Sequence, residues 1–102
     1  MTTGTPIKLA PMKRFRWSAE KNRKLIAERG ISFEEVVSAM AHDGLLDELE
    51  HPNKSRYPHQ RLFVVRVRGY VYLVPFVETS DELFLKTIIP SRKATRIYIA
   101  SE

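Results

Sequence analysis

The amino-acid sequence predicts an α+β domain with a short N-terminal strand, two helices, a three- to four-stranded antiparallel sheet and a short C-terminal helix. Residues 61–89 form a run rich in Val, Ile, Phe and Tyr. Turn-forming residues interrupt this run at 68–69 and at 79–81, as in antiparallel strands joined by tight turns. Serines that can cap helices precede and follow the run at positions 18, 32 and 91.

The length of 102 residues corresponds to one domain. Residues 1–12 contain one glycine and two prolines without a regular period, so we expect a flexible extension there and a single domain over residues 13–102. The sequence has no cysteine, which excludes disulfides and a cysteine nucleophile. It has no apolar run of about 20 residues and no signal-peptide core, so we expect a cytoplasmic protein with no membrane partner.

A short strand and a helix are expected at the start of the domain. Phe15 and Trp17 alternate with polar residues, which favours a strand with both rings facing the core, and stacking of Trp17 on a base is the alternative. Ser18 is a suitable N-cap for a helix over residues 19–29, which Gly30 would end. The apolar face of this helix is thin and consists of Ala19, Asn22, Leu25 and Ile26.

The second helix has the clearest local signature in the chain. Ser32 and Glu35 are spaced as a capping box, and Ile31 and Val36 occupy the hydrophobic-staple positions. Apolar residues then recur at helical spacing, which predicts an amphipathic helix packed on the sheet and ending within residues 42–44. These residues are Phe33, Val36, Val37 and Met40.

The sheet is predicted to have three main strands near residues 62–68, 70–78 and 82–89. Residues 45–50, LLDELE, alternate weakly and fit a fourth strand, although a helix is nearly as good an interpretation. Pro75 lies within the second main strand and cannot donate to a ladder. We therefore expect a bulge or a locally free N–H at this position.

Lys86 is the first candidate functional residue, because it lies between Phe84 and Ile88 on one face of the predicted third strand. The structural alternative is that Lys86 extends past the sheet edge into water. Arg92 and Lys93 occupy the first two positions of the predicted last helix, where the helix dipole disfavours cations unless an anion binds. The inward face of that helix is predicted to consist of Ala94, Ile97 and Tyr98.

The charge distribution favours an anionic partner, of which nucleic acid is the commonest. The net charge is +5 and the isoelectric point is about 9.7. Half of the acidic residues lie between Glu34 and Glu50, whereas residues 13–29, 54–68 and 86–96 are strongly basic. This distribution predicts one positive surface and one acidic edge, and the alternative is that the charge only serves solubility.

These residue types suit cleavage of RNA by its own 2′-hydroxyl. A base removes the 2′-OH proton, cations stabilise the phosphorane, an acid protonates the leaving 5′-oxygen, and DNA is spared. The candidate catalytic residues are Arg61, Lys86, Arg92, His51 and His59. The candidate RNA-binding residues are Lys21, Lys24, Arg66, Lys93, Tyr57 and Tyr98.

We expect no metal ion and no other cofactor. His51 and His59 lie in a proline-containing loop, residues 51–60, and are too few for a typical metal site, although Glu48 and Glu50 come just before them. The sequence also contains no phosphate-binding glycine loop and no known hydrolase motif. The structural alternative is that the histidines are ordinary loop residues and the arginines form a solvated face.

Two blocks of the sequence resemble BrnT-type toxins. FRWSAEKNRKLIAERGISFEEVV, residues 15–37, is similar to the N-terminal motif of that family, and IIPSRKAT, residues 88–95, to its C-terminal element. With the strands between them, the resemblance spans residues 15–98. It implies a RelE-like fold, a metal-independent ribonuclease toxin of a type II toxin–antitoxin system, and a cognate antitoxin that binds DNA. The motifs carry over Arg92, Lys21 and Lys93.

The chain departs from the family pattern at three places within the resemblance. Ser18 stands where the family usually has Asp, and Pro90 is inserted between the sheet and the last helix. Thr87 stands where a basic residue is expected, with Lys86 one position earlier and on the other strand face. A divergent family member with weak or altered nuclease activity is therefore an alternative interpretation.

The leading expectation is an endoribonuclease toxin whose partners are a cognate antitoxin and RNA, including ribosome-bound mRNA. The sequence is compatible with a homodimer and with a toxin–antitoxin heterotetramer. The alternative is a non-catalytic basic module of the same fold that binds RNA or the antitoxin. A third possibility is a structural interaction module whose charge is incidental.

Overall fold

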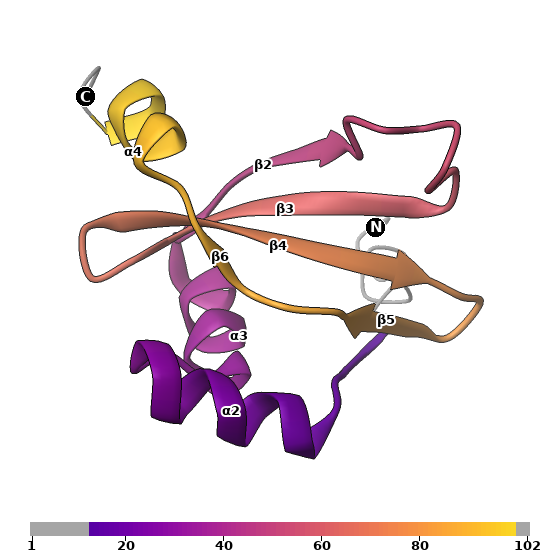
Figure 1. The fold of residues 1–102 in the computed structure, drawn as a ribbon, viewed down its shortest axis with the longest axis horizontal. Coiled ribbons are helices and arrows are strands. Elements are labelled where there is room, and N and C mark those ends of the chain that lie inside the picture. Colours follow the sequence, from indigo (N-terminus) through magenta and orange to yellow (C-terminus); the bar gives the residue numbers. More distant parts are fainter. Residues whose placement is uncertain (1–12, 100–102) are drawn as a thin grey trace, which may run out of the picture.

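The computed structural model describes residues 13–99, so the extension predicted for residues 1–12 lies outside the described residues. The predicted α+β class and the predicted order of elements are confirmed (Figure 1). The elements are β1 (Arg14–Arg16), α2 (Ala19–Arg29), α3 (Phe33–His42), β2 (Leu45–Glu50), β3 (Gln60–Val67), β4 (Tyr70–Glu78), β5 (Glu82–Leu85), β6 (Ile89–Pro90) and α4 (Arg92–Ile99). None of these helices is long and apolar enough to span a membrane.

The sheet has the strand order β1-β5-β4-β3-β2, and β6 pairs with β4 after β5 has ended. The pairs β2–β3, β3–β4 and β4–β5 are antiparallel, as predicted, whereas β1 runs parallel to β5. Residues 45–50 form the strand β2, which decides between the two interpretations of LLDELE. The turn between β3 and β4 has positive φ at Arg68 (52°) and Gly69 (77°), as a tight two-residue hairpin turn requires.

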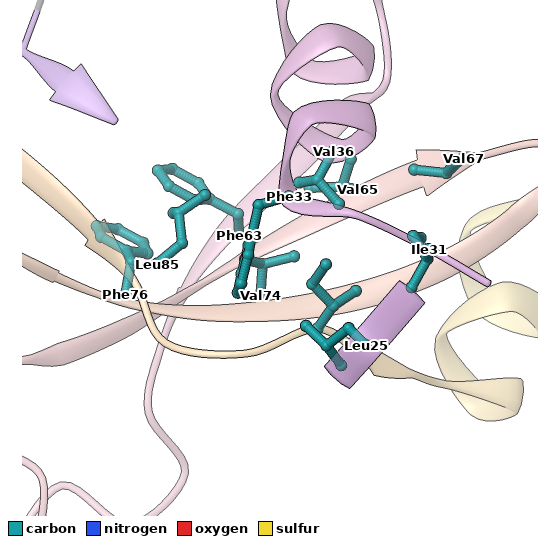
Figure 2. Packing of buried hydrophobic residues seen from close by; sticks show 11 residues of the cluster. Leu25, Ile31, Phe33, Val36, Phe63, Val65, Val67, Val74, Phe76 and Leu85 are labelled. Carbon is teal, nitrogen blue, oxygen red and sulfur yellow. The ribbon is translucent and has the colours of Figure 1, made fainter. Parts of the chain in front are cut away.

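The sheet has two faces, and helices cover them unequally (Figure 1). The α2–α3 face packs against both N-terminal helices and holds most of the core (Figure 2). Its buried strand residues are Phe63, Val65, Val67, Val74, Phe76 and Leu85. The opposite face, which we call the α4 face, is covered by α4 over a smaller cluster that includes Val64, Val71 and Ala94. Strand alternation also places Arg14, Arg16, Leu62, Arg66, Leu73, Pro75, Val77, Glu82 and Phe84 on the α4 face.

The predicted caps hold both N-terminal helices in place. The Ser18 hydroxyl accepts a hydrogen bond from the Lys21 N–H, and the Ser32 hydroxyl accepts one from the Glu35 N–H, each at 3.1 Å. Gly30 has φ 68°, which ends α2 in the left-handed region that glycine tolerates. The sequence therefore sets the α2–α3 corner locally, before any packing against the sheet.

Asn22 joins the two N-terminal helices from a buried position. Its side-chain oxygen accepts from the Phe33 N–H, and its amide donates to Glu34, both at 2.8 Å. The hydrogen bond from Asn22 lowers the pKa of the Glu34 carboxyl. Asn22 and Leu25 are buried as predicted, but Ala19 is exposed and Ile26 is 49% exposed, so the prediction that these two residues belong to the inner face was wrong. The buried residues of α2 are therefore Asn22 and Leu25 alone.

Pro75 interrupts the ladder on only one side of β4. The pairing of β3 with β4 continues through it without a shift in register. On the other side, β5 leaves β4 after Leu85 and β6 rejoins it at Ile89. Three residues, 86–88, therefore stand opposite two residues of β4, Val74 and Pro75. The predicted bulge exists, but the extra residue belongs to the strand that faces the proline.

This bulge corrects the predicted third strand. The strand ends at Leu85 rather than continuing to Ile89. The extra residue reverses the alternation, so Ile88 is buried in the same cluster as Leu85, while Ile89 is 41% exposed. Lys86 therefore does not share a strand face with Ile88, because the regular alternation on which that prediction depended ends before it.

The last helix is fixed to β4 by hydrogen bonds at its first turn. The Ser91 hydroxyl accepts from the Ala94 N–H at 3.0 Å, which confirms the predicted cap. The Thr95 hydroxyl accepts from the Val71 N–H at 2.9 Å. Ala94 is buried and Tyr98 is half-buried, as predicted, but Ile97 is 54% exposed. A helix that rests on the sheet along one narrow stripe has no room for Ile97 on its inner side.

Candidate functional site

The α4 face carries more cations than carboxylates. Its cationic residues are Arg14, Arg16 and Arg66 on the strands, Lys86 in the bulge, and Arg92, Lys93 and Arg96 on α4. Its carboxylates in the described residues are Asp47 and Glu82, and each has a partner. Glu82 accepts from Arg16 at 2.9 Å, and Asp47 accepts from the Tyr98 hydroxyl at 2.8 Å. The face is therefore positive after these pairs are taken into account.

Lys86 is exposed at the start of the bulge opposite Pro75. Its N–H donates to the Pro75 carbonyl at 2.8 Å, which fixes the backbone where β5 ends. Its ammonium lies 5.8 Å from the centroid of the Phe84 ring, on the α4 face. A cation beside a half-buried aromatic ring can contact a phosphate and a base of one nucleotide together.

Arg92 and Lys93 lie at the other end of the α4 face. Both side chains are exposed in the first turn of α4, where the backbone N–H groups also favour an anion. Arg66 is close by, because it stands directly opposite Val71, and the Val71 N–H donates to α4. Val71, beside α4, and Pro75, beside Lys86, are four residues apart in β4, which corresponds to about 13 Å along the strand. The cations therefore form a track along the sheet and do not meet at one point.

Arg61 lies on the α2–α3 face, away from this track. Its guanidinium forms ion pairs with Glu48 and with Glu78, the latter at 2.9 Å, and lies 5.5 Å from the centroid of the Phe76 ring. Hydrogen bonding and charge from Lys13, followed by Arg61, hold the pKa of the Glu78 carboxyl below its ordinary value. The structure does not bring Arg61 together with Lys86, because strand alternation puts them on opposite faces.

The two candidate histidines lie in the loop between β2 and β3. The His51 ring packs against the Tyr57 ring with centroids 4.5 Å apart, and its Nδ1 accepts from the Asn53 N–H at 3.0 Å. The Arg56 guanidinium lies 5.5 Å from the Tyr57 ring centroid. His59 is exposed and precedes the first residue of β3. This loop adjoins the end of β3 that is remote from α4.

Among the candidate RNA-binding residues, only some share the α4 face. Arg66 and Lys93 lie on it, whereas Lys21 and Lys24 belong to α2 on the other side of the sheet. Tyr98 reaches across from α4 to β2, and the hydrogen bond to Asp47 raises the pKa of its hydroxyl. That hydroxyl is therefore a poor proton donor while the bond to Asp47 is in place.

The sequence interpretation missed three cations of the α4 face: Arg14, Arg16 and Arg96. The signal for the first two was available, because the alternation that placed Phe15 in the core places both neighbouring arginines on the opposite face. Arg96 follows from the helical period after Arg92. Trp17 stacks on Phe33 with centroids 5.5 Å apart, so its ring belongs to the core, as expected.

No pocket is found in the described part of the chain. Residues 13–99 also contain no group of three or more His, Asp or Glu side chains placed to hold a metal ion. The candidate site is the cation-rich surface of the α4 face, with the aromatic ring of Phe84 beside Lys86. A scan of the sequence against models of protein families finds no match, and no curated protein matches it.

Proposed function

We propose that the protein is an RNA-cleaving toxin of the BrnT kind, which binds RNA along the α4 face and is held inactive by a cognate antitoxin. The observation that carries the proposal is the gathering of cations from β1, β3, the bulge and α4 on the one sheet face that α2 and α3 leave uncovered. A basic groove or track with interspersed aromatic rings is the usual means of binding single-stranded RNA.

The positions of the two BrnT-like blocks support the same proposal. The block at residues 30–35 forms the corner between α2 and α3, and the block at residues 91–95 caps α4 and fixes it to β4. The first block builds the covered face of the sheet. The second forms the first turn of α4, where the exposed side chains of Arg92 and Lys93 can contact a phosphate beside the α4 face.

The proposed chemistry is attack of the RNA 2′-hydroxyl on the adjacent phosphate. Lys86, beside Pro75, which stands opposite Leu62 near the loop end of β3, neutralises the phosphorane, while Arg92 binds another phosphate of the same RNA strand farther along the track. A loop histidine, His59 or His51, accepts the 2′-OH proton. The 2′-oxygen forms the new bond to phosphorus, the 5′-oxygen leaves and takes a proton from water, and the products carry a 2′,3′-cyclic phosphate and a free 5′-hydroxyl. Arg61 has no direct role, because its two carboxylate partners already neutralise it.

A second candidate function is RNA binding without cleavage. It is favoured by the spread of the cations along the α4 face and by the separation of the loop histidines from the cations of α4. A surface that spreads its cations along a strand binds phosphates efficiently, but it does not by itself align a base, a nucleophile and a leaving group.

The test is an RNA-cleavage assay without added metal, with a mixed-sequence RNA and its 2′-O-methyl counterpart. The proposal expects cleavage of the RNA alone, with cyclic phosphate ends. It expects this activity to be lost in Lys86→Ala, weakened in Arg92→Ala and retained in Arg23→Ala, an exposed cation on α2. Thermal melts establish that each variant is folded. Expression of the wild type is expected to arrest growth.

The same assay separates the two candidates. Binding of both RNAs with no cleavage and no growth arrest favours the non-catalytic function. Failure to bind RNA even at low salt contradicts both, since phosphate contacts are strongest there.

A further inference from the structure

The strand β2 forms an outer edge of the sheet. Among residues 13–99, β3 is its only strand neighbour, and β2 lies at the end of the strand order (Figure 1). Alternate N–H and C=O groups of its six residues therefore face away from β3. The Glu48 N–H donates to the Asp47 side chain at 2.8 Å. The partner of this backbone N–H is therefore a side chain and not a neighbouring strand, as expected for a strand at the edge of a sheet.

Two leucines on this edge are unusually exposed. Leu45 is 44% exposed and Leu49 is 38% exposed. A register shift between Leu45 and Asp47 puts the two leucines on different faces, with Leu45 opposite Val65 and Leu49 opposite Leu62. A strand added beside β2 would cover part of both leucines, whereas a helix or loop on one face would cover one. The pattern of exposure therefore fits an added strand.

The charges of the edge select the kind of strand. The carboxylates of Asp47, Glu48 and Glu50 lie between and beside the two leucines. Glu48 is paired with Arg61, whereas within the described residues Asp47 accepts only from uncharged groups, the Tyr98 hydroxyl and the Glu48 N–H. The pair of Glu50 with Lys54 is solvent-exposed and therefore weak. A second copy that paired β2 with β2 would place carboxylates opposite carboxylates, which is unfavourable across a strand pair. Pairing β2 with the basic β1 of another copy is also unfavourable, because β1 has three residues and could pair with only part of the six-residue β2. Such head-to-tail pairing would also repeat from copy to copy and form an open filament. A basic strand from a different protein meets none of these objections.

We propose that the edge of β2 binds an extended, basic segment of a partner protein, which adds to the sheet as a further strand. Main-chain hydrogen bonds supply the affinity, apolar residues of the segment cover Leu45 on one face and Leu49 on the other, and its cations face the carboxylates between and beside them. This edge is distinct from the cationic track of the α4 face, so the inference does not depend on RNA binding or cleavage.

The probe is a synthetic eight-residue peptide in which every third residue is Val and the others are Lys, so that successive valines fall on opposite faces, titrated into the isotopically labelled full chain. Two controls match it: the same peptide with alternate residues N-methylated, and a peptide with Glu in place of Lys. We expect the Lys peptide to slow hydrogen exchange of the edge-facing β2 amides. Binding of each control is expected to be at least about tenfold weaker, because one loses the hydrogen bonds of one strand edge and the other the charge match.

Variants keep the outcome tied to the edge. Leu49→Lys places a cation on β2 and is expected to weaken binding of the Lys peptide by about tenfold, whereas Ile26→Lys on α2 is expected to leave it unchanged. Equal binding of the Lys peptide and its N-methylated form overturns the proposal, because the attraction is then only electrostatic. Absence of any change in hydrogen exchange at the β2 amides also overturns it. So does self-association of the chain, seen in sedimentation as a species that grows with protein concentration and that Leu49→Lys abolishes, because the edge then binds a second copy.

Discussion

The two faces of the sheet carry arginines in contrasting surroundings. On the α2–α3 face, Arg61 is held between Glu48 and Glu78 and lies beside the Phe76 ring. On the α4 face, Arg92 is exposed in the first turn of a helix whose N–H groups already favour an anion. The same side chain is thus a structural ion-pair partner in one place and a candidate phosphate ligand in the other. The face on which the side chain lies, and the partners that it meets there, decide its role more than the number of basic residues does.

The largest expected difference between the faces is in stability. Phe76 is 1% exposed and stacks on Phe63 with ring centroids 3.9 Å apart. We expect Phe76→Ala to lower the free energy of unfolding by about 3–5 kcal/mol, because it removes a large side chain from the main cluster. Val71→Ala, in the smaller cluster under α4, is expected to cost about 1.5–2.5 kcal/mol. Urea unfolding measures both, and equal losses would contradict the unequal division of the core.

The next expected effect concerns the buried amide that joins the helices of the covered face. Asn22→Ala leaves the buried Phe33 N–H without its acceptor, so we expect a loss of about 1–3 kcal/mol. The pKa of Glu34 is expected to rise in this variant, since the hydrogen bond from Asn22 is the main cause of its lowering. Side-chain NMR titration measures this pKa.

The control for this prediction is the neighbouring exposed residue, Arg23. Arg23→Ala is expected to change the free energy of unfolding by less than about 0.5 kcal/mol and to leave the hydrogen bond between Asn22 and Glu34 in place. A Glu34 pKa that stays low in Asn22→Ala would show that another group sets it.

The fold was predictable wherever a local rule and the hydrophobic period agreed. Ser18, Gly30 and Ser32 set the bounds of α2 and α3 by capping alone. Prediction failed where a long-range partner decided. The strand that begins at Glu82 ends at Leu85 and not at the predicted Ile89, because Pro75 in the neighbouring strand β4 offers no N–H to the ladder. Likewise, Ile26 was expected on the inner face of α2 but is exposed, whereas Asn22 is buried as expected, with partners for its amide at the start of α3 that the sequence did not reveal.

The candidate site was predictable in its chemistry but not in its arrangement. A basic surface was expected from composition, and Lys86 and Arg92 were singled out from local pattern alone. Arg61 was grouped with them by charge, yet the alternation of β3 puts it on the other face with two carboxylates. Those partners come from β2 and β4, and strand register could not be known before the sheet order was known.

RNA binding provides the sharpest comparison of Arg92 with Arg61. If Arg92 contacts a phosphate, Arg92→Ala weakens binding by about 1 kcal/mol and reduces the slope of log affinity against log salt by about one. Arg61→Ala is expected to leave that slope unchanged, because the two carboxylates already neutralise its charge. Fluorescence anisotropy with a labelled single-stranded RNA at several salt concentrations measures both. Equal slopes for the two variants would remove the distinction between the faces.

The smallest expected effect is a pH dependence on the α2–α3 side. The pKa of Glu78 in the folded protein lies below its ordinary value of 4.5, mainly because of the hydrogen bond from Lys13. The stabilisation is therefore fully present above about pH 4.5, and it is lost as the pH falls towards the folded-state pKa, because the unfolded chain takes up the proton first. We expect Glu78→Gln to be less stable than the wild type at pH 6, by less than about 1 kcal/mol since the pair is partly exposed.

Below pH 4, the difference between the wild type and Glu78→Gln is expected to shrink. Lys13→Met is expected to give the same pH dependence, and the double variant little more than either single one, because the two residues share one interaction. Unfolding in urea at pH 3 to 6 measures the series. Strictly additive losses, with a pH dependence in Glu78→Gln alone, would mean that Arg61, and not Lys13, is the partner that holds Glu78 ionised.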